Sequence, residues 1–153
     1  MSEDTYLTAY YGYNSGIKHD GTSVSNTWGQ WLSVFQIKSD GSVINELGNF
    51  LHDTYTNSDP YNDLIKIDDD TYALAYKSYN YGPQTSGSWG GWIKTFKVNG
   101  GNINQINELQ HYTSSDSYWH SWERLSATTY ALAWQGSGGD GYITSFTIST
   151  DGA

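Results

Sequence analysis

The feature that most constrains the fold of this chain is an internal repeat. A six-residue, Tyr-containing segment occurs three times, and each copy is followed by a second segment that begins with Trp or Tyr and ends in Phe-x-Ile or Phe-x-Val. The first segment covers residues 5–10, 71–76 and 129–134, and the second covers residues 31–37, 92–98 and 142–148. The period of two at the end of the second segment indicates a β-strand, and the Asp-Gly or Gly-Gly that follows it is typical of a hairpin turn. Repeated units of this kind bury their apolar residues by stacking on one another.

Two further segments complete the repeating unit. Residues 44–47 read Ile-Asn-Glu-Leu, and the same four letters recur at residues 106–109. A fourth segment precedes the second and third copies of the first one, at residues 64–67 and 122–125. We therefore predict ten short strands in groups of three, four and three. They form a single repeat domain, 1–153, of about 2.5 units, divided into 1–63, 64–121 and 122–153.

The composition supports an all-β fold. Aromatic residues make up 16% of the chain, with 14 Tyr and 7 Trp, and Gly contributes 17 residues. Tyr, Trp and Thr favour strands, whereas Gly, Asn and Asp favour turns. Each buried Trp or Tyr covers roughly 150–250 Å². This aromatic content therefore argues against the disorder that a polar, acidic chain could otherwise show.

Residues 64–76, 92–98, 129–136 and 141–152 resemble the four-stranded blade repeats of β-propeller regions in microbial surface proteins. The resemblance implies antiparallel blades but no particular activity, because blades serve binding, scaffolding and catalysis alike. A propeller needs at least about four blades. We therefore expect a partial β-propeller completed by oligomerisation, with open sheet edges at both ends of the chain. A β-trefoil or prism is the alternative, since three units of about 50 residues fit the length, and a sandwich or stacked-sheet arrangement stays open.

Charge and composition exclude several classes of function. Asp and Glu number 16 against 7 Lys and Arg, which disfavours nucleic acid and anionic membranes as partners. The chain has no Cys, and its mean hydropathy of -0.62 argues against membrane insertion. The first residues have neither the basic region nor the apolar core of a signal peptide. A Tyr-, Thr-, Asn- and Gly-rich chain with few Lys is nevertheless typical of exported proteins, so we expect an extracellular or cell-surface location.

The candidate binding residues lie where the repeats differ most. The first and second segments are separated by 20, 15 and 7 residues in the three units, and insertions in one loop of a repeat usually mark its binding face. Exposed rings offer an apolar face to the C–H groups of a sugar, and Asn or Asp side chains bind its hydroxyls. The candidate glycan-binding residues are Tyr13, Asp20, Asn26, Trp28, Tyr81, Trp89, Trp119 and Asp140. By contrast, we expect Trp31, Trp92 and Trp122 to be structural.

The sequence favours binding over catalysis. Glu46 and Glu108 hold the same place in the repeated Ile-Asn-Glu-Leu, and matched environments do not separate the pKa values of an acid and a base. The chain contains no zinc, phosphate-loop or nucleophile-elbow motif, and the acidic run at residues 68–70 is interpreted as a turn. We predict a non-enzymatic, cofactor-free, lectin-like module whose multivalent sites bind glycans or cell-surface polysaccharide. The alternative is a self-assembling structural subunit of a surface filament, appendage or virion, and both hypotheses include a homo-oligomer.

Overall fold

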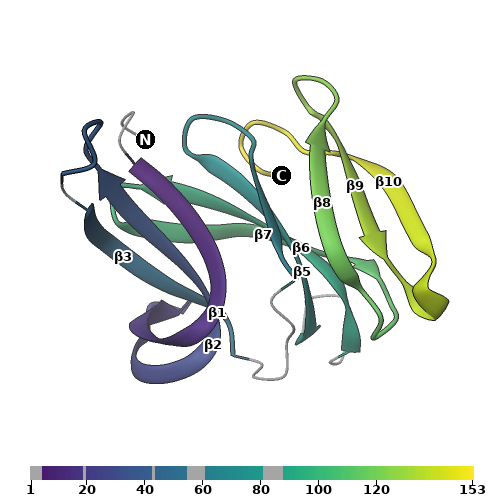
Figure 1. Cartoon of the computed structure of the whole chain (residues 1–153), viewed down its shortest axis with the longest axis horizontal. Coiled ribbons are helices and arrows are strands. Elements are labelled where there is room, and N and C mark those ends of the chain that lie inside the picture. Colours follow the sequence, from purple (N-terminus) through teal and green to yellow (C-terminus); the bar gives the residue numbers. More distant parts are fainter. Residues whose placement is uncertain (1–4, 19, 43, 55–60, 81–87) are drawn as a thin grey trace.

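The computed structural model describes residues 5–18, 20–42, 44–54, 61–80 and 88–153 (Figure 1). This part of the chain is built of β-strands and contains one short 3₁₀ helix, η1, at Ser137–Gly139. No helix in it is long or apolar enough to cross a membrane. The strands are β1 (Thr5–Lys18), β2 (Ser23–Ile37), β3 (Ile44–Asp53), β4 (Asp63–Lys66), β5 (Thr71–Asn80), β6 (Ser88–Asn99), β7 (Asn102–Tyr112), β8 (Tyr118–Arg124), β9 (Thr129–Gln135) and β10 (Gly141–Thr147).

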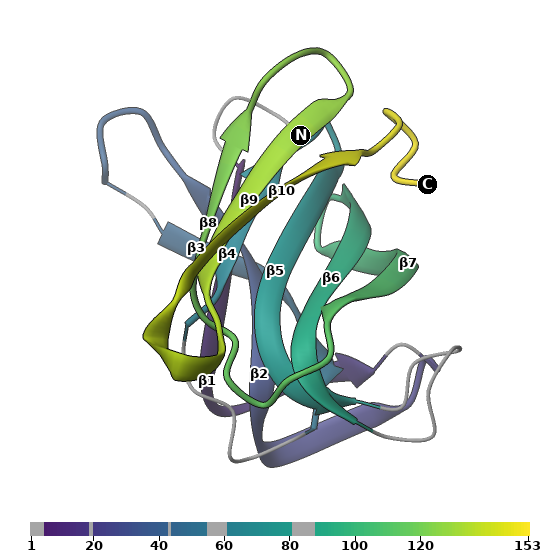
Figure 2. The ribbon, with the colours of Figure 1, turned by 90° about the vertical axis from the view of Figure 1, so that its right-hand side faces the viewer.

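The strands form three sheets that follow one another along the chain. The first sheet contains β1, β2 and β3, the middle sheet has the order β4-β5-β6-β7, and the third has the order β10-β9-β8. Chain neighbours within each sheet pair antiparallel. Figures 1 and 2 show the sheets stacked face against face, with the middle sheet between the other two. The predicted all-β, antiparallel class is confirmed, and the groups of three, four and three strands agree with the motif count.

Successive side chains of a strand point to opposite faces of its sheet, so the repeated first segment gives each sheet two different faces. We call the face that carries Tyr6, Tyr72 or Tyr130 the aromatic face of its sheet. The opposite face, which carries Ala9, Ala75 or Ala133, is the alanine face. This assignment follows from the strand registers and from the way the core residues divide between two clusters.

The middle sheet is buried on both faces. Its aromatic face packs on Leu32, Val34 and Phe50 of the first sheet and forms one core cluster. Its alanine face packs on Leu132 and Trp134 of the third sheet and forms the second cluster. At both interfaces the Tyr, Trp and Phe side chains of an aromatic face thus pack against the mainly aliphatic side chains of the neighbouring alanine face. Trp31, Trp92 and Trp122 are buried, as expected.

The first sheet does not leave the open edge that we expected at this end of the chain. Its long β1–β2 hairpin curls over the aromatic face, so that Ile17 and Lys18 pair in parallel with Phe50 and Leu51 and close a small barrel. Gly16 allows this approach, because a Cβ atom there would overlap the backbone of Asn49. The interior of the barrel is consequently filled, and only the half of the aromatic face nearest the start of β1 stays uncovered.

One of the predicted equivalences is wrong in register. Glu46 lies opposite Phe35, whereas Glu108 lies opposite Lys94. Phe35 corresponds to Phe96, whose partner is Gln105, so Glu46 is equivalent to Gln105 and not to Glu108. The error arose because Ile-Asn occurs twice in β7, at residues 103–104 and 106–107, and only strand pairing shows which copy is aligned. The environments of the two glutamates therefore differ, and their supposed symmetry no longer argues against catalysis.

Candidate functional site

The variable hairpins lie at one end of the molecule. Figure 1 shows the β1–β2 and β9–β10 hairpins at its lower edge, together with the end of β5 and the start of β6. The alternation of strand direction in an antiparallel sheet places these equivalent connections on the same side. The end that carries the insertions is therefore also the end where most of the candidate binding residues lie.

The first aromatic site, which we call the hairpin platform, consists of Tyr11, Tyr13 and Trp28. Tyr13 and Trp28 are direct cross-strand partners on β1 and β2. Tyr11 precedes Tyr13 by two residues and therefore lies on the same face of β1. The Trp28 ring centroid lies 5.6 Å from each tyrosine ring, stacked at 29° on Tyr11 and tilted at 49° from Tyr13. Tyr13 and Trp28 are both exposed. Two of the predicted residues are thus brought together, and Tyr11 is added to them.

The middle sheet repeats this arrangement. Tyr79 and Trp89 are cross-strand partners on β5 and β6, with ring centroids 5.8 Å apart at 70°. Counted from the repeated first segment, Tyr79 occupies the position of Tyr13. Tyr81, which we predicted as a glycan-binding residue, lies outside the described residues.

The second aromatic site, which we call the Lys77 cluster, joins the middle and third sheets. The Lys77 ammonium lies 3.8 Å from the ring centroid of Tyr118 on β8 and 5.4 Å from that of Trp89. A cation over a ring face is attracted by its quadrupole. Beyond Tyr118, the ring of Tyr61 lies 5.7 Å away, and the exposed Trp119 ring lies 4.1 Å from Tyr61. The cluster therefore links Trp89 and Trp119 in one row, which spacing alone did not predict.

The backbone of Trp119 is unusual. Its φ of 55° lies in the left-handed region, and the pairing of β8 with β9 changes register between Tyr118 and Ser121. A bulky residue in this conformation costs roughly 1–3 kcal/mol, and such strain is found mainly at functional sites. The distortion is accompanied by an indole that faces solvent instead of the core.

The polar candidates do not form one site with the tryptophans. Asp20 lies in the β1–β2 turn, where hydrogen bonds from the backbone and side chain of Thr22 lower its pKa. Asp140 precedes β10 in another hairpin, and its carbonyl accepts a 2.8 Å hydrogen bond from the Gly136 N–H. Asn26 lies near the hairpin platform on β2, in a left-handed conformation that asparagine tolerates, and its N–H donates to Ser15 Oγ. The predicted residues are thus divided between two aromatic sites and two separate turns.

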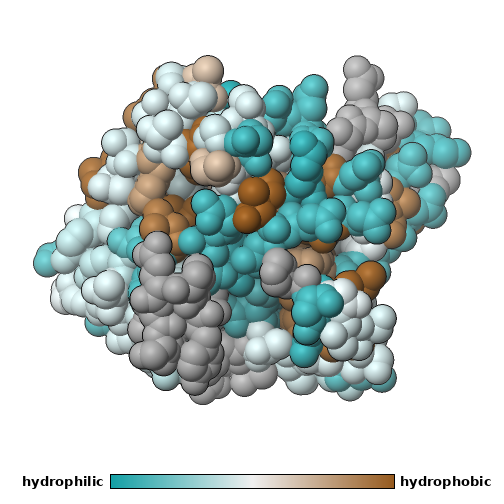
Figure 3. Space-filling view, turned by 180° about the vertical axis from the view of Figure 1, so that it is seen from behind, coloured by the Kyte–Doolittle hydropathy of each residue, from teal (hydrophilic) through white to brown (hydrophobic). Residues whose placement is uncertain are grey.

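Two cavities were not expected from the sequence. One of about 200 Å³ lies between the β1–β2 tip, β3 and β7, and the amides of Asn49, Asn102, Asn104 and Gln105 line it. These residues meet because of the barrel closure and the stacking of the sheets, which no local pattern reveals. The other, of about 110 Å³, lies beside Leu109 and Phe146, where the third sheet has no strand opposite β7. Figure 3 shows hydrophobic residues gathered on the side of the molecule where β9 and β10 lie.

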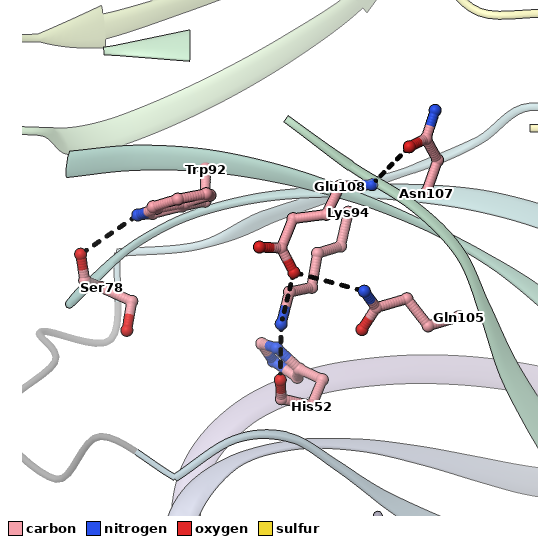
Figure 4. Close-up of polar contacts among 7 residues, drawn as sticks. All are labelled: His52, Ser78, Trp92, Lys94, Gln105, Asn107 and Glu108. Carbon is pink, nitrogen blue, oxygen red and sulfur yellow. Dashed lines mark hydrogen bonds and ion pairs between the residues drawn. The ribbon is translucent and has the colours of Figure 1, made fainter. Parts of the chain in front are cut away.

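The buried charges belong to the packing of the first two sheets. Lys94 Nζ lies 3.3 Å from Glu108 Oε2 and donates a 2.7 Å hydrogen bond to the carbonyl of His52 (Figure 4). Gln105 donates to the same glutamate oxygen over 3.2 Å. The Lys94 and Glu108 side chains are both buried. The pair is therefore oriented to hold β7 and β3 together, and it does not face a solvent-accessible site.

No family model, no curated protein and no solved structure matches this chain. Its function therefore has to be inferred from the residues and the geometry described above.

Proposed function

We propose that this protein is a non-catalytic carbohydrate-binding module, lectin-like in character, whose sites are formed by aromatic residues at the hairpin end. The hairpin platform is the single observation that supports this most strongly. Trp28 and Tyr13 present exposed rings to solvent, with the half-buried Tyr11 stacked on Trp28, although nothing about strand formation requires two exposed aromatic side chains at that place. Ring faces of this kind suit the C–H groups of a pyranose, and the tyrosine hydroxyls suit its oxygen atoms.

The charge of the chain narrows the class of glycan. A formal net charge of -9 repels polyanions, so sulfated and uronic-acid polysaccharides are unfavourable ligands. The proposed ligand is a neutral glycan with exposed hexose rings. Weak sites of this kind reach useful avidity when several are linked, and the Lys77 cluster supplies a second aromatic site on the same chain.

A self-assembling structural role is the second candidate. It is favoured by the stacked, blade-like sheets, whose outermost faces carry exposed apolar residues. Under this proposal the repeat units of several chains together complete a propeller-type ring or a filament. The two candidate functions are compatible, because an assembly would multiply the glycan sites.

The proposal is tested by screening the protein on a glycan array and measuring the neutral ligands it binds by titration calorimetry. Trp28→Ala is expected to remove binding at the hairpin platform, while circular dichroism shows an unchanged fold. Tyr6→Ala is the matched control for soluble monovalent ligands, because it removes an exposed ring from β1, the strand paired with β2, at the end far from Trp28. Undiminished glycan affinity in a folded Trp28→Ala protein would overturn the assignment of this site, and binding to no neutral glycan would overturn the proposed function.

A further inference from the structure

We propose that the alanine face of the third sheet binds the aromatic face of the first sheet in a second copy of this chain. The inference goes beyond glycan binding and does not depend on it. It assigns a head-to-tail contact that repeats, between chains, the packing that the structure shows twice within one chain.

The alanine face of the third sheet is exposed at positions that the middle sheet buries. Leu125 is equivalent to Ile67, because each precedes its repeated tyrosine by five residues and donates the same backbone hydrogen bond across its turn. Ile67 is 1% exposed, whereas Leu125 is 60% exposed. Ile93 is 5% exposed, whereas the equivalent Ile143 is 74% exposed. The third sheet thus keeps two large apolar side chains of a covered face without a cover, whereas Glu123 replaces the Ile65 of the middle sheet on the same face.

The aromatic face of the first sheet is likewise exposed at positions that are buried in the middle sheet. Tyr6 is 50% exposed, although Tyr72 in the same position of the middle sheet is only 7% exposed. Ile44 pairs with Ile37 as Ile103 pairs with Val98, yet Ile44 is 66% exposed and Ile103 is 8% exposed. The curled hairpin covers the other half of this face, so the uncovered half, with Tyr6 and Ile44, is the part available for contact.

A second copy is the partner that fits these two faces. Both interfaces within the chain place the Tyr, Trp and Phe side chains of an aromatic face against the mainly aliphatic side chains of an alanine face. Two alanine faces in contact would bring Leu125 and Ile143 together without the aromatic side chains that fill both interfaces within the chain, which disfavours a symmetric pair of third sheets. The complementary face for Leu125 is therefore the one that carries Tyr6, and this chain exposes both. Such a heterologous contact builds a ring if its rotation closes and an open stack if it does not.

The test uses two variants that each disable one face of the intact protein. Leu125→Glu places a carboxylate on the third sheet, and Ile44→Glu places one on the first sheet. Burial of an unpaired charge opposes contact, so each variant is expected to associate at least about tenfold more weakly than the wild type in sedimentation velocity over a wide concentration range. Ile106→Glu is the matched control, because Ile106 is an exposed aliphatic residue on β7 of the middle sheet, which contributes to neither proposed contact surface.

Mixing the two variants distinguishes a head-to-tail contact from other modes. Each variant keeps the face that the other has lost, so the mixture is expected to form a dimer of one copy of each and to stop there. A wild-type mass that remains monomeric at every concentration would overturn the proposal, as would failure of the mixture to dimerise while both variants melt like the wild type. Trp28→Ala is expected to leave assembly unchanged, so a failure of glycan binding and a failure of assembly give different results.

Discussion

His52 on β3 and His111 on β7 hold equivalent positions in successive sheets, one at each intersheet interface. His52 lies 5.0 Å from the ring of Tyr76 and 6.0 Å from that of Phe96, whereas His111 lies 4.7 Å from Trp134 and 6.2 Å from Phe146. The aromatic partners are themselves repeat equivalents. The same histidine-in-aromatic packing therefore joins the first sheet to the middle sheet and the middle sheet to the third.

This packing makes the stability of the protein sensitive to acid. Burial lowers the pKa of His111 from 6.5 to about 3, helped by the nearby His120, and burial together with Lys94 lowers the pKa of His52 well below 6.5. Because the unfolded chain binds these protons and the folded chain does not, the stabilisation is complete above pH 6.5 and decreases as pH falls toward the folded-state values. We expect His111 to lower the free energy of unfolding by about 2 kcal/mol between about pH 7.5 and pH 5, and His52 to act in the same direction.

Urea denaturation at several pH values checks this expectation. His111→Leu removes the titrating group and is expected to reduce the pH dependence by about 2 kcal/mol over the same interval. The pKa values of Asp20, Asp40 and Asp70 are also lowered, but these groups affect the free energy of unfolding only at lower pH, since their ordinary pKa is 3.8. An unchanged slope in His111→Leu would show that this histidine does not report on the interface.

The buried Lys94–Glu108 pair has a neutral counterpart in the first sheet. Register places Ser33 opposite Asn49, the two positions equivalent to Lys94 and Glu108, and these two side chains are hydrogen-bonded. Glu108→Asn alone leaves a buried ammonium without its partner and is expected to lower the free energy of unfolding by about 3–5 kcal/mol. The double variant Lys94→Ser with Glu108→Asn copies the neutral pair and should unfold at a higher urea concentration than Glu108→Asn alone. Equal or lower stability of the double variant would contradict this account.

Because the backbone of Trp119 is left-handed, we expect the glycine variant at this position to be more stable than the alanine variant, which is the reverse of the usual order in a strand. Both Trp119→Gly and Trp119→Ala lose the indole, but only glycine adopts a φ of 55° without steric cost. Trp119→Gly is therefore expected to be more stable than Trp119→Ala by about 1–2 kcal/mol in urea denaturation. The neighbouring Tyr118 is the control, because it has no positive φ, and there the glycine variant should be the less stable one. The same order at both positions would mean that Trp119 carries no strain.

Much of the fold was predictable from local pattern. The Tyr-containing segment and the Phe-x-Ile or Phe-x-Val ending each recur three times. They predicted the strand groups because the two motifs lie on adjacent, paired strands in each sheet. The overlapping Ile-Asn pairs of β7 misled the alignment, because identical letters three residues apart are resolved only by the hydrogen-bonding register. Tyr13 and Trp28 were predicted only as candidate residues of one variable loop, whereas the structure extends β1 and β2 through that loop and makes the two residues cross-strand partners.

The sequence by itself determined the class of this protein. It indicated short antiparallel strands with two alternating faces, and many aromatic side chains that are either buried in a core or exposed at the surface. These properties depend on residues near one another in the chain, so the periodicity of the sequence indicates them. Only the tertiary structure decided that the first hairpin closes on β3, that Lys77 joins Trp89 to Trp119, and which copies of one motif are covered. Coverage depends on which sheet lies next to which. Leu125 and Ile67 share a motif position but differ in exposure, because another sheet packs on the alanine face of the middle sheet and none of the described strands packs on that of the third sheet.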